Sequence, residues 1–204
     1  MSELLTELFS SRVRAAVLAH ALPRPHLGFS LTDFSRLLGL PISSLQHECY
    51  KLERIGLLSA RRAGNARLYR VNPTCPVLAP LTALIHACIG LKAMLRGCVD
   101  GVTGLELAFL IDRAAAGEQP TSHLVLVGEV PLEALDGAVA RAETALGLPP
   151  GRLEVAFFRP DDWHARVVAG HPFVTSLLTS GRLELVGSVD DELTGLFSPS
   201  IAGT

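Results

Sequence analysis

Apolar residues in the first third of the chain recur at helical spacing, and a short alternating segment follows them. Residues 3–21 carry leucine or valine every three or four positions, which predicts a helix with an interruption near Ser10. A second, shorter helix is predicted to begin after Ser30 or Thr32, residues that can cap a helix N-terminus. Gly39 is predicted to stop that helix, because glycine adopts the left-handed conformation that ends many helices.

The third predicted helix, from Leu40 to Gly56, has two faces of different chemistry. Its apolar positions lie three or four apart and predict one buried stripe: Ile42, Leu45, Cys49, Leu52 and Ile55. Its other positions form a polar face with hydrogen-bond donors and acceptors: Ser43, Ser44, Gln46, His47, Tyr50, Lys51 and Arg54. One side would therefore hold a domain core while the other stays available to a partner.

A basic hairpin is predicted directly after this helix. Residues 57–60 begin a strand, residues 61–67 form a basic turn, and residues 68–71 alternate as a returning strand. Gly64-Asn65 supplies turn residues that tolerate positive φ. Two helices joined by a glycine turn and followed by a basic hairpin favour a winged helix-turn-helix that binds double-stranded DNA.

This interpretation assigns DNA contacts by position. The start of the third helix would face base edges: Ser43, Ser44, Gln46 and His47. Its later cations, Lys51 and Arg54, would reach phosphates. The hairpin would contact the backbone or minor groove through Arg61, Arg62, Asn65 and Arg67. The alternatives are a helical hairpin with a solvated polar face, a domain for protein contact, or DNA binding without fine sequence choice.

Charge is distributed unevenly along the chain and favours the same interpretation. Residues 1–75 hold ten Lys and Arg and five Asp and Glu, a net charge of +5. Residues 76–204 hold eight Lys and Arg and 15 Asp and Glu, a net charge of −7. A basic first part suits a phosphate-binding surface, and an acidic remainder would orient that part toward the duplex.

The second part of the chain predicts a connecting helix and then a mixed domain. Residues from Val77 to about Leu95 form an apolar helix that pairs either with its copy in a second subunit or with its own chain. Strands are predicted at 103–111, 123–128, 152–158 and 182–186, with helices at 132–146, 160–168 and 172–178.

The expected fold class is therefore a two-domain protein, α+β or α/β. Its parts are a winged helix-turn-helix at 1–75, a connecting or dimerisation helix at 76–97, a mixed sheet flanked by helices at 98–187, and a mobile tail at 188–204.

Residues 9–72 resemble the winged helix-turn-helix of ArsR/MarR-type transcriptional regulators. The resemblance is carried by four segments: Leu8–Arg14, Leu37–Leu40, Leu52–Leu58 and Gly64–Tyr69. It implies a homodimer bound to palindromic DNA.

The second domain resembles a minimal nucleotidyltransferase. The order strand–loop–strand–helix–strand carries this resemblance, with Glu154–Phe158 followed by Pro160–Trp163. Active members have a Gly-Ser pair after the first strand, and two Asp residues that hold metal ions at the start of the second. Here Asp112 and Arg113 occupy the first place, and Thr121 and His123 the second.

Thr and His do not replace bridging carboxylates in two-metal chemistry. We therefore expect a degenerate domain that is not an enzyme and that serves dimerisation, ligand sensing or partner contact. The alternative is an active nucleotidyltransferase that modifies a protein or RNA and is targeted by its winged helix.

The remaining candidates for chemistry are weaker. The widely spaced cysteines predict buried thiols, with a metal-sensing site at Cys49 and Cys75 as the alternative. Asp161 and Asp162 suit the start of a helix better than a metal site with His164. We expect no cofactor. A small-molecule effector bound where nucleotidyltransferases have their active-site cleft is an open alternative, and the sequence does not identify it. Without a secretory signal or a run of about 20 apolar residues, a cytoplasmic protein without membrane contact is expected.

Overall fold

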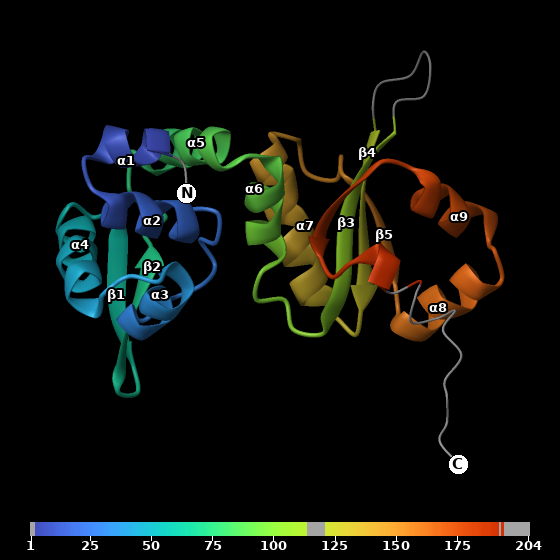
Figure 1. The fold of residues 1–204 in the computed structure, drawn as a ribbon, viewed down its shortest axis with the longest axis horizontal. Helices are drawn as coiled ribbons and strands as arrows, with labels where there is room; N and C mark the ends of the chain where they lie inside the picture. The colour runs from blue at the N-terminus through green and yellow to red at the C-terminus, as the bar shows by residue number, and fades with distance from the viewer. Residues whose placement is uncertain (1–2, 114–120, 192, 194–204) are drawn as a thin grey trace. The chain divides into compact units, whose positions relative to one another are not determined.

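A computed structural model describes residues 3–113, 121–191 and 193, without the side chains of residues 112, 113, 121 and 122. The chain divides into two compact units, Met1–Asp100 and Gly101–Thr204 (Figure 1). The first holds a two-stranded sheet and the second a four-stranded one, so the fold is a mixture of α and β structure. The boundary at Asp100 places the whole predicted connecting segment in the first unit.

Four helices precede the hairpin of the first unit. They are α1 (Glu3–Phe9), α2 (Arg12–Ala21), α3 (Leu31–Leu38) and α4 (Ile42–Arg54). The interruption predicted near Ser10 is confirmed, and Ser11 caps α2 by accepting a hydrogen bond from the Arg14 backbone N–H at 3.2 Å.

Helix α3 begins and ends as its sequence predicts. Ser30 and Asp33 form a capping box in which each side chain accepts a hydrogen bond from the other residue's backbone. Gly39 ends the helix with a φ of 65°, in the left-handed region. These two signals fix the length of α3 and the position of the turn that leads into α4.

The predicted hairpin is confirmed as β1 (Leu58–Ala63) and β2 (Ala66–Val71), and we call residues 58–71 the wing. The strands are antiparallel, and the two-residue turn contains Gly64 with a φ of 58°. Phe29, which precedes α3, adds a bridge to Tyr69 through backbone hydrogen bonds of 2.9 and 2.8 Å. The order of helices and hairpin confirms a helix-turn-helix followed by a wing.

The core of the first unit collects apolar side chains from all of these elements. Among them are Leu5, Leu18, Phe34, Leu45, Cys49, Leu52, Leu58, Tyr69 and Ile85. The predicted buried stripe of α4 is correct in its middle and wrong at its ends, because Ile42 is 47% exposed and Ile55 is 65% exposed. Both lie at the ends of the helix, beyond the reach of the core.

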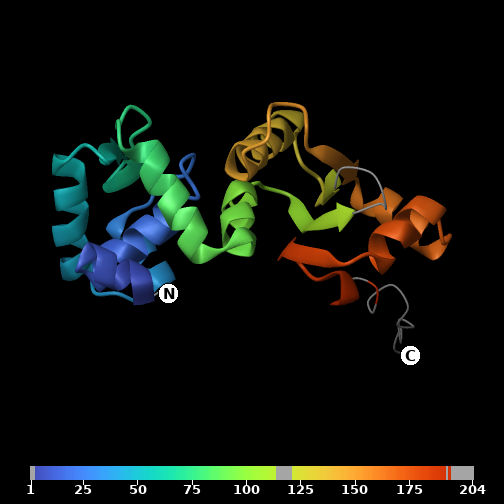
Figure 2. The same cartoon turned by 90° about the horizontal axis from the view of Figure 1, so that it is seen from above.

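The predicted connecting helix is two helices, α5 (Leu78–Ile89) and α6 (Leu91–Val99), bent by 119° at Gly90 (Figure 2). Gly90 has φ 83° and ψ 165°, a conformation that only glycine adopts readily. Ile85 is fully buried in the core of its own chain, and Leu78 and Leu81 pack beside it. No single helix among the described residues is long and apolar enough to span a bilayer. Helices α5 and α6 reach that length and apolar composition only when they are taken together, and they are bent by 119° between them.

The second unit confirms the predicted order of strands and helices. Its elements are β3 (Leu105–Arg113), β4 (Thr121–Gly128), α7 (Leu132–Leu146), β5 (Glu154–Phe158), α8 (Pro160–Val168), α9 (Pro172–Thr179) and β6 (Arg182–Val186). The strand order is β5-β4-β3-β6, with β4 and β5 parallel and the other pairs antiparallel.

One face of this sheet packs around Trp163 of α8, which is fully buried. Phe109 of β3 and Phe158 of β5 contact its ring, with centroids 6.2 and 5.3 Å away. Val189 is also fully buried in this core. The tail was predicted to be mobile from residue 188, and this start is too early because Val189 is buried in the core. Residues 194–204 lie outside the described part.

Candidate nucleic-acid interface

The outward side of α4 carries four of the ten residues predicted to contact DNA. Leu45, Cys49 and Leu52 turn into the core, so the positions between them turn away from it. The exposed residues of this side are Ser43, Gln46, His47, Tyr50 and Arg54, and we call them the α4 outer face. Ser44 is half-buried at the edge of this face.

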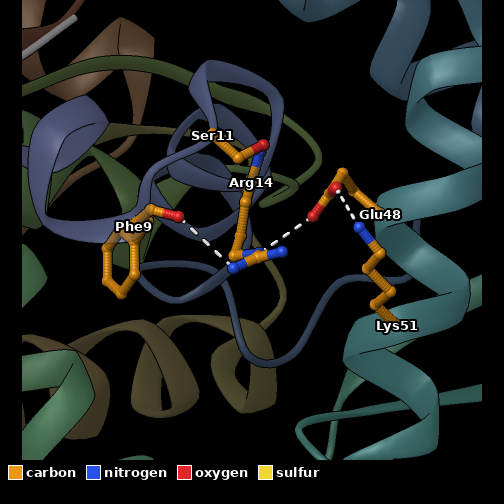
Figure 3. A network of polar contacts seen from close by, with 5 residues as sticks. All are labelled: Phe9, Ser11, Arg14, Glu48 and Lys51. Atoms are coloured by element: carbon orange, nitrogen blue, oxygen red, sulfur yellow. Dashed lines mark hydrogen bonds and ion pairs between the residues drawn. The ribbon is translucent and has the colours of Figure 1, made fainter.

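A buried carboxylate lies on the inner side of the same helix, and sequence analysis missed it (Figure 3). Glu48 is 7% exposed, and its Oε2 accepts a hydrogen bond from Nε of Arg14 at 2.8 Å. Lys51 donates from Nζ to the other carboxylate oxygen at 3.0 Å. Arg14 also donates to the carbonyl of Phe9 at 3.3 Å, so the network joins α4 to α2 and the end of α1.

The protonation of Glu48 follows from this network. Burial by itself would raise the pKa of the carboxyl, but the hydrogen bonds from Lys51 and Arg14 outweigh it. The pKa of Glu48 therefore lies below its usual range, and the group is ionised at neutral pH. Lys51, predicted to meet a phosphate, has its charge engaged within the protein.

The wing is attached to α4 by a second ion pair. Arg67 of β2 donates to both carboxylate oxygens of Glu53 at 2.7 and 2.6 Å, and its guanidinium lies 5.6 Å from the centre of the Tyr69 ring. The hydrogen bonds to Glu53 raise the pKa of Arg67 above its usual range. A bidentate pair of this kind fixes direction as well as distance, so Arg67 holds the wing against the helix.

The cations at the wing tip are arranged differently. Arg62 lies directly opposite Arg67 in the hairpin, and Arg61 lies opposite Leu68. Since side chains alternate along a strand, Arg61 and Arg62 project from opposite faces of the wing. Both are exposed, as is Asn65 in the turn. Within the described part of the chain, Arg54, Arg61 and Arg62 make no ion pair.

Sequence analysis also passed over Arg70, the last arginine of β2. Its guanidinium donates to the backbone carbonyls of Pro25, at 3.3 Å, and His26. The sequence does carry a signal that Glu48 is buried, because it lies three residues after Leu45 and four before Leu52 and so falls on the same side of the helix. No spacing rule pairs an arginine of one strand with carbonyls more than 40 residues earlier in the chain.

The buried thiol on α4 has no evident chemistry. Burial, together with Glu48 and Glu53, raises the pKa of Cys49 to about 12, which keeps the thiol protonated at neutral pH. Cys75 is half-buried and also a free thiol. In the described ranges, no group of three or more His, Cys, Asp or Glu residues could hold a metal ion.

The four positions of the second unit predicted to be degenerate active-site positions fall on two paired strands. Asp112 and Arg113 end β3, where they pair with Ser122 and Thr121 of β4, and their side chains lie outside the described residues. His123 is described, and its Nε2 lies 2.9 Å from Oε2 of Glu154 on the neighbouring strand β5.

Comparisons with known proteins add little to this geometry. No protein-family model matches the chain, and no curated protein sequence does either. Among solved structures, reduced HlyU from Vibrio cholerae N16961 is similar over 41% of this chain and 83% of its own, with 23% sequence identity and a TM-score of 0.34.

Proposed function

We propose that this chain is a sequence-specific DNA-binding regulator of transcription and that its first unit makes the DNA contacts. The observation that carries the proposal is the combination of the α4 outer face with a wing whose tip holds arginines that make no ion pair with any described residue. A protruding helix with exposed polar side chains fits the major groove, and a basic hairpin beside it suits the backbone or minor groove. The net charge of +5 in residues 1–75 supports the same partner.

The proposed contacts divide by residue type. Ser43, Gln46 and His47 are exposed near the start of α4, and we assign them to base edges. Arg54, Arg61 and Arg62 are assigned to phosphates, because no described carboxylate neutralises them. The Ile42 side chain, 47% exposed at the first turn, is suited to an apolar contact with a thymine methyl group.

Lys51 and Arg67 receive a different role in this proposal. Each is bonded to a glutamate of α4, Lys51 to Glu48 and Arg67 to Glu53. A phosphate would have to compete with those carboxylates for the same charge. We therefore assign both cations to orienting α4 and the wing rather than to the main phosphate contacts.

We further propose that the chain acts as a homodimer. Helices α1 and α5 contact each other within the first unit, and both expose large apolar side chains. Leu4 and Leu8 are 57% and 54% exposed, and Leu84 is 39% exposed. Burying these groups against a second copy would remove apolar surface from water, and two recognition helices would then suit a palindromic site. Light scattering on the chain and a Leu8→Glu variant tests this, with a monomeric parent as the contradicting result.

For the second unit we propose a role without catalysis, in ligand sensing, partner contact or dimerisation. The support is the sequence, in which Thr121 and His123 stand where the resemblance to nucleotidyltransferases calls for metal-binding acids. Incubation with labelled nucleoside triphosphates and Mg²⁺ or Mn²⁺ tests it. Transfer of label to a protein or RNA would favour the alternative, an active nucleotidyltransferase.

Selection of bound duplexes from a random pool is the experiment for the main proposal. We expect enrichment of a defined sequence with two inverted half-sites. Gln46→Ala and His47→Ala should each relax the preference at one position per half-site, since each removes one base contact. A pool that stays random after repeated rounds would contradict sequence-specific binding. Retention of all duplexes alike would instead indicate DNA binding without sequence choice.

A further inference from the structure

The segment between α2 and α3, residues Pro23–Gly28, is bonded to two distant parts of the first unit. We call it the α2–α3 loop. One set of contacts joins it to the wing, and another joins it to Asp100, the residue at which the first unit ends. The DNA-contact proposal uses neither set.

The wing side is formed by backbone and side-chain hydrogen bonds. Phe29, directly after the loop, pairs with Tyr69 of β2 in both directions. Arg70 donates to the carbonyls of Pro25 and His26. Gly28 leaves room beside the preceding position of the strand, since a Cβ added there would lie 3.6 Å from Cβ of Leu68. The loop therefore sets the position of β2 on the side away from α4.

The other side is formed by the end of α6. Nε of Arg24 donates to Oδ2 of Asp100 at 2.6 Å, and Nε2 of His26 lies 2.8 Å from the Asp100 backbone carbonyl. Arg24 is itself held by the carbonyl of His20 on α2 at 2.9 Å. Gly97 packs so closely that a Cβ there would lie 2.6 Å from Cβ of Pro23.

We propose that Asp100 is a positioning residue for the wing, and that it acts through Arg24, His26 and Arg70. The proposal rests on the proposed DNA binding, since the wing is what it positions. Two contacts join the sides: the Asp100 carboxylate accepts a hydrogen bond from Arg24, and the ring of His26 lies against the Asp100 backbone carbonyl while its own carbonyl accepts a hydrogen bond from Arg70. Pro23 and Pro25 restrict the loop backbone, so displacing Asp100 moves the carbonyls that hold β2.

The direct test is hydrogen exchange of wing amides in the full chain without DNA. Asp100→Ala removes the carboxylate bonded to Arg24 and leaves the backbone carbonyl that His26 contacts. It should speed exchange in residues 66–71 on the order of fivefold, the factor for losing one hydrogen bond. Asp100→Asn keeps an acceptor oxygen for Arg24 but loses the charge, so its wing exchange should fall between those of the parent and Asp100→Ala. Arg96→Ala is the matched control, because Arg96 lies 4.0 Å from the same carboxylate and makes no hydrogen bond or ion pair with a loop residue in the described part of the chain.

A double-mutant cycle separates positioning from general stability. Arg70→Ala should also speed wing exchange, and Asp100→Ala should add little to it, because the Arg70 bonds through which Asp100 is proposed to act are already lost while the Phe29–Tyr69 backbone bonds remain in both variants. Protection of α5 amides should not change in any of these variants. Equal wing exchange in Asp100→Ala and the parent would overturn the proposal, as would additive effects or a loss of protection throughout the unit.

Failure of the proposed function gives a different pattern. If the chain binds no DNA but Asp100→Ala still loosens the wing, the structural link stands and DNA binding falls. If the chain binds DNA and its affinity and wing exchange are the same in Asp100→Ala, the link falls and DNA binding stands.

Discussion

Replacing Glu48 by Gln tests the network that holds the recognition helix. The change keeps the size of the side chain and removes the charge that Arg14 and Lys51 share. A hydrogen bond to a charged group contributes about 1.5–3 kcal/mol, and the low end applies because Arg14 is 31% exposed and partly hydrated. The pair with Lys51, three residues along the same helix, adds about 0.3–0.5 kcal/mol. We expect Glu48→Gln to destabilise the first unit by about 2 kcal/mol.

Native-state hydrogen exchange of α4 amides measures this loss, which corresponds to about a 30-fold drop in protection. Trp163 is the only tryptophan and lies in the second unit, so its fluorescence midpoint in urea should not move. Glu53→Gln is a matched control on the same helix, because its partner Arg67 is 56% exposed and such surface pairs contribute about 1 kcal/mol or less. Equal protection of α4 in Glu48→Gln and the parent would refute the reasoning.

The same network has a pH dependence with a definite sign. Since the folded state lowers the pKa of Glu48, the stabilisation is complete above the pKa of the unfolded chain. It is lost as pH falls through the lower, folded pKa. Glu48→Gln should therefore show a weaker loss of α4 protection on acidification than the parent does.

Three further predictions concern substitutions of single residues. Burial lowers the pKa of His20 to about 4, so on acidification the unfolded chain takes up a proton at this residue before the folded chain does. His20→Leu should therefore reduce the stability that is lost between about pH 6.5 and 4, measured by chemical denaturation. Gly90→Ala should destabilise the first unit by about 1–3 kcal/mol from backbone strain alone, since no atom lies within 4 Å of the added Cβ; unchanged α5 exchange would contradict this. In binding titrations against salt, Arg54→Ala should reduce the slope by about one and Lys51→Ala by much less, because Glu48 already neutralises Lys51; equal effects would contradict that assignment.

The sequence predicts the elements well because their signals are local. The stop of α3 at Gly39 and the hairpin turn at Gly64-Asn65 depend on residues next to each other. Alternating or buried apolar runs identify the four strands of the second unit for the same reason. Gly90 was missed because apolar residues on both sides continue the helical period, although the backbone turns there by 119°.

Contacts between distant residues were beyond such patterns. Arg67 and Glu53 are 14 residues apart, and nothing in their spacing distinguishes a cation held by an acid from one available to phosphate. Glu48 was assigned neither to the buried stripe of α4 nor to its polar face, because burial was inferred from apolar residues only. The candidate interface was therefore predicted as a surface, while the division of its cations into paired and unpaired required the fold.

The DNA-binding proposal is tested most directly by the salt dependence of affinity in an Arg61→Ala/Arg62→Ala variant. Fluorescence anisotropy with a duplex selected by the parent chain gives the slope of log K against log salt for both proteins. Each phosphate contact contributes about 0.9 to that slope, so the variant should bind more weakly and lose about two in slope per chain bound. Identical affinities and slopes would show that the wing does not contact DNA and would contradict the proposed function.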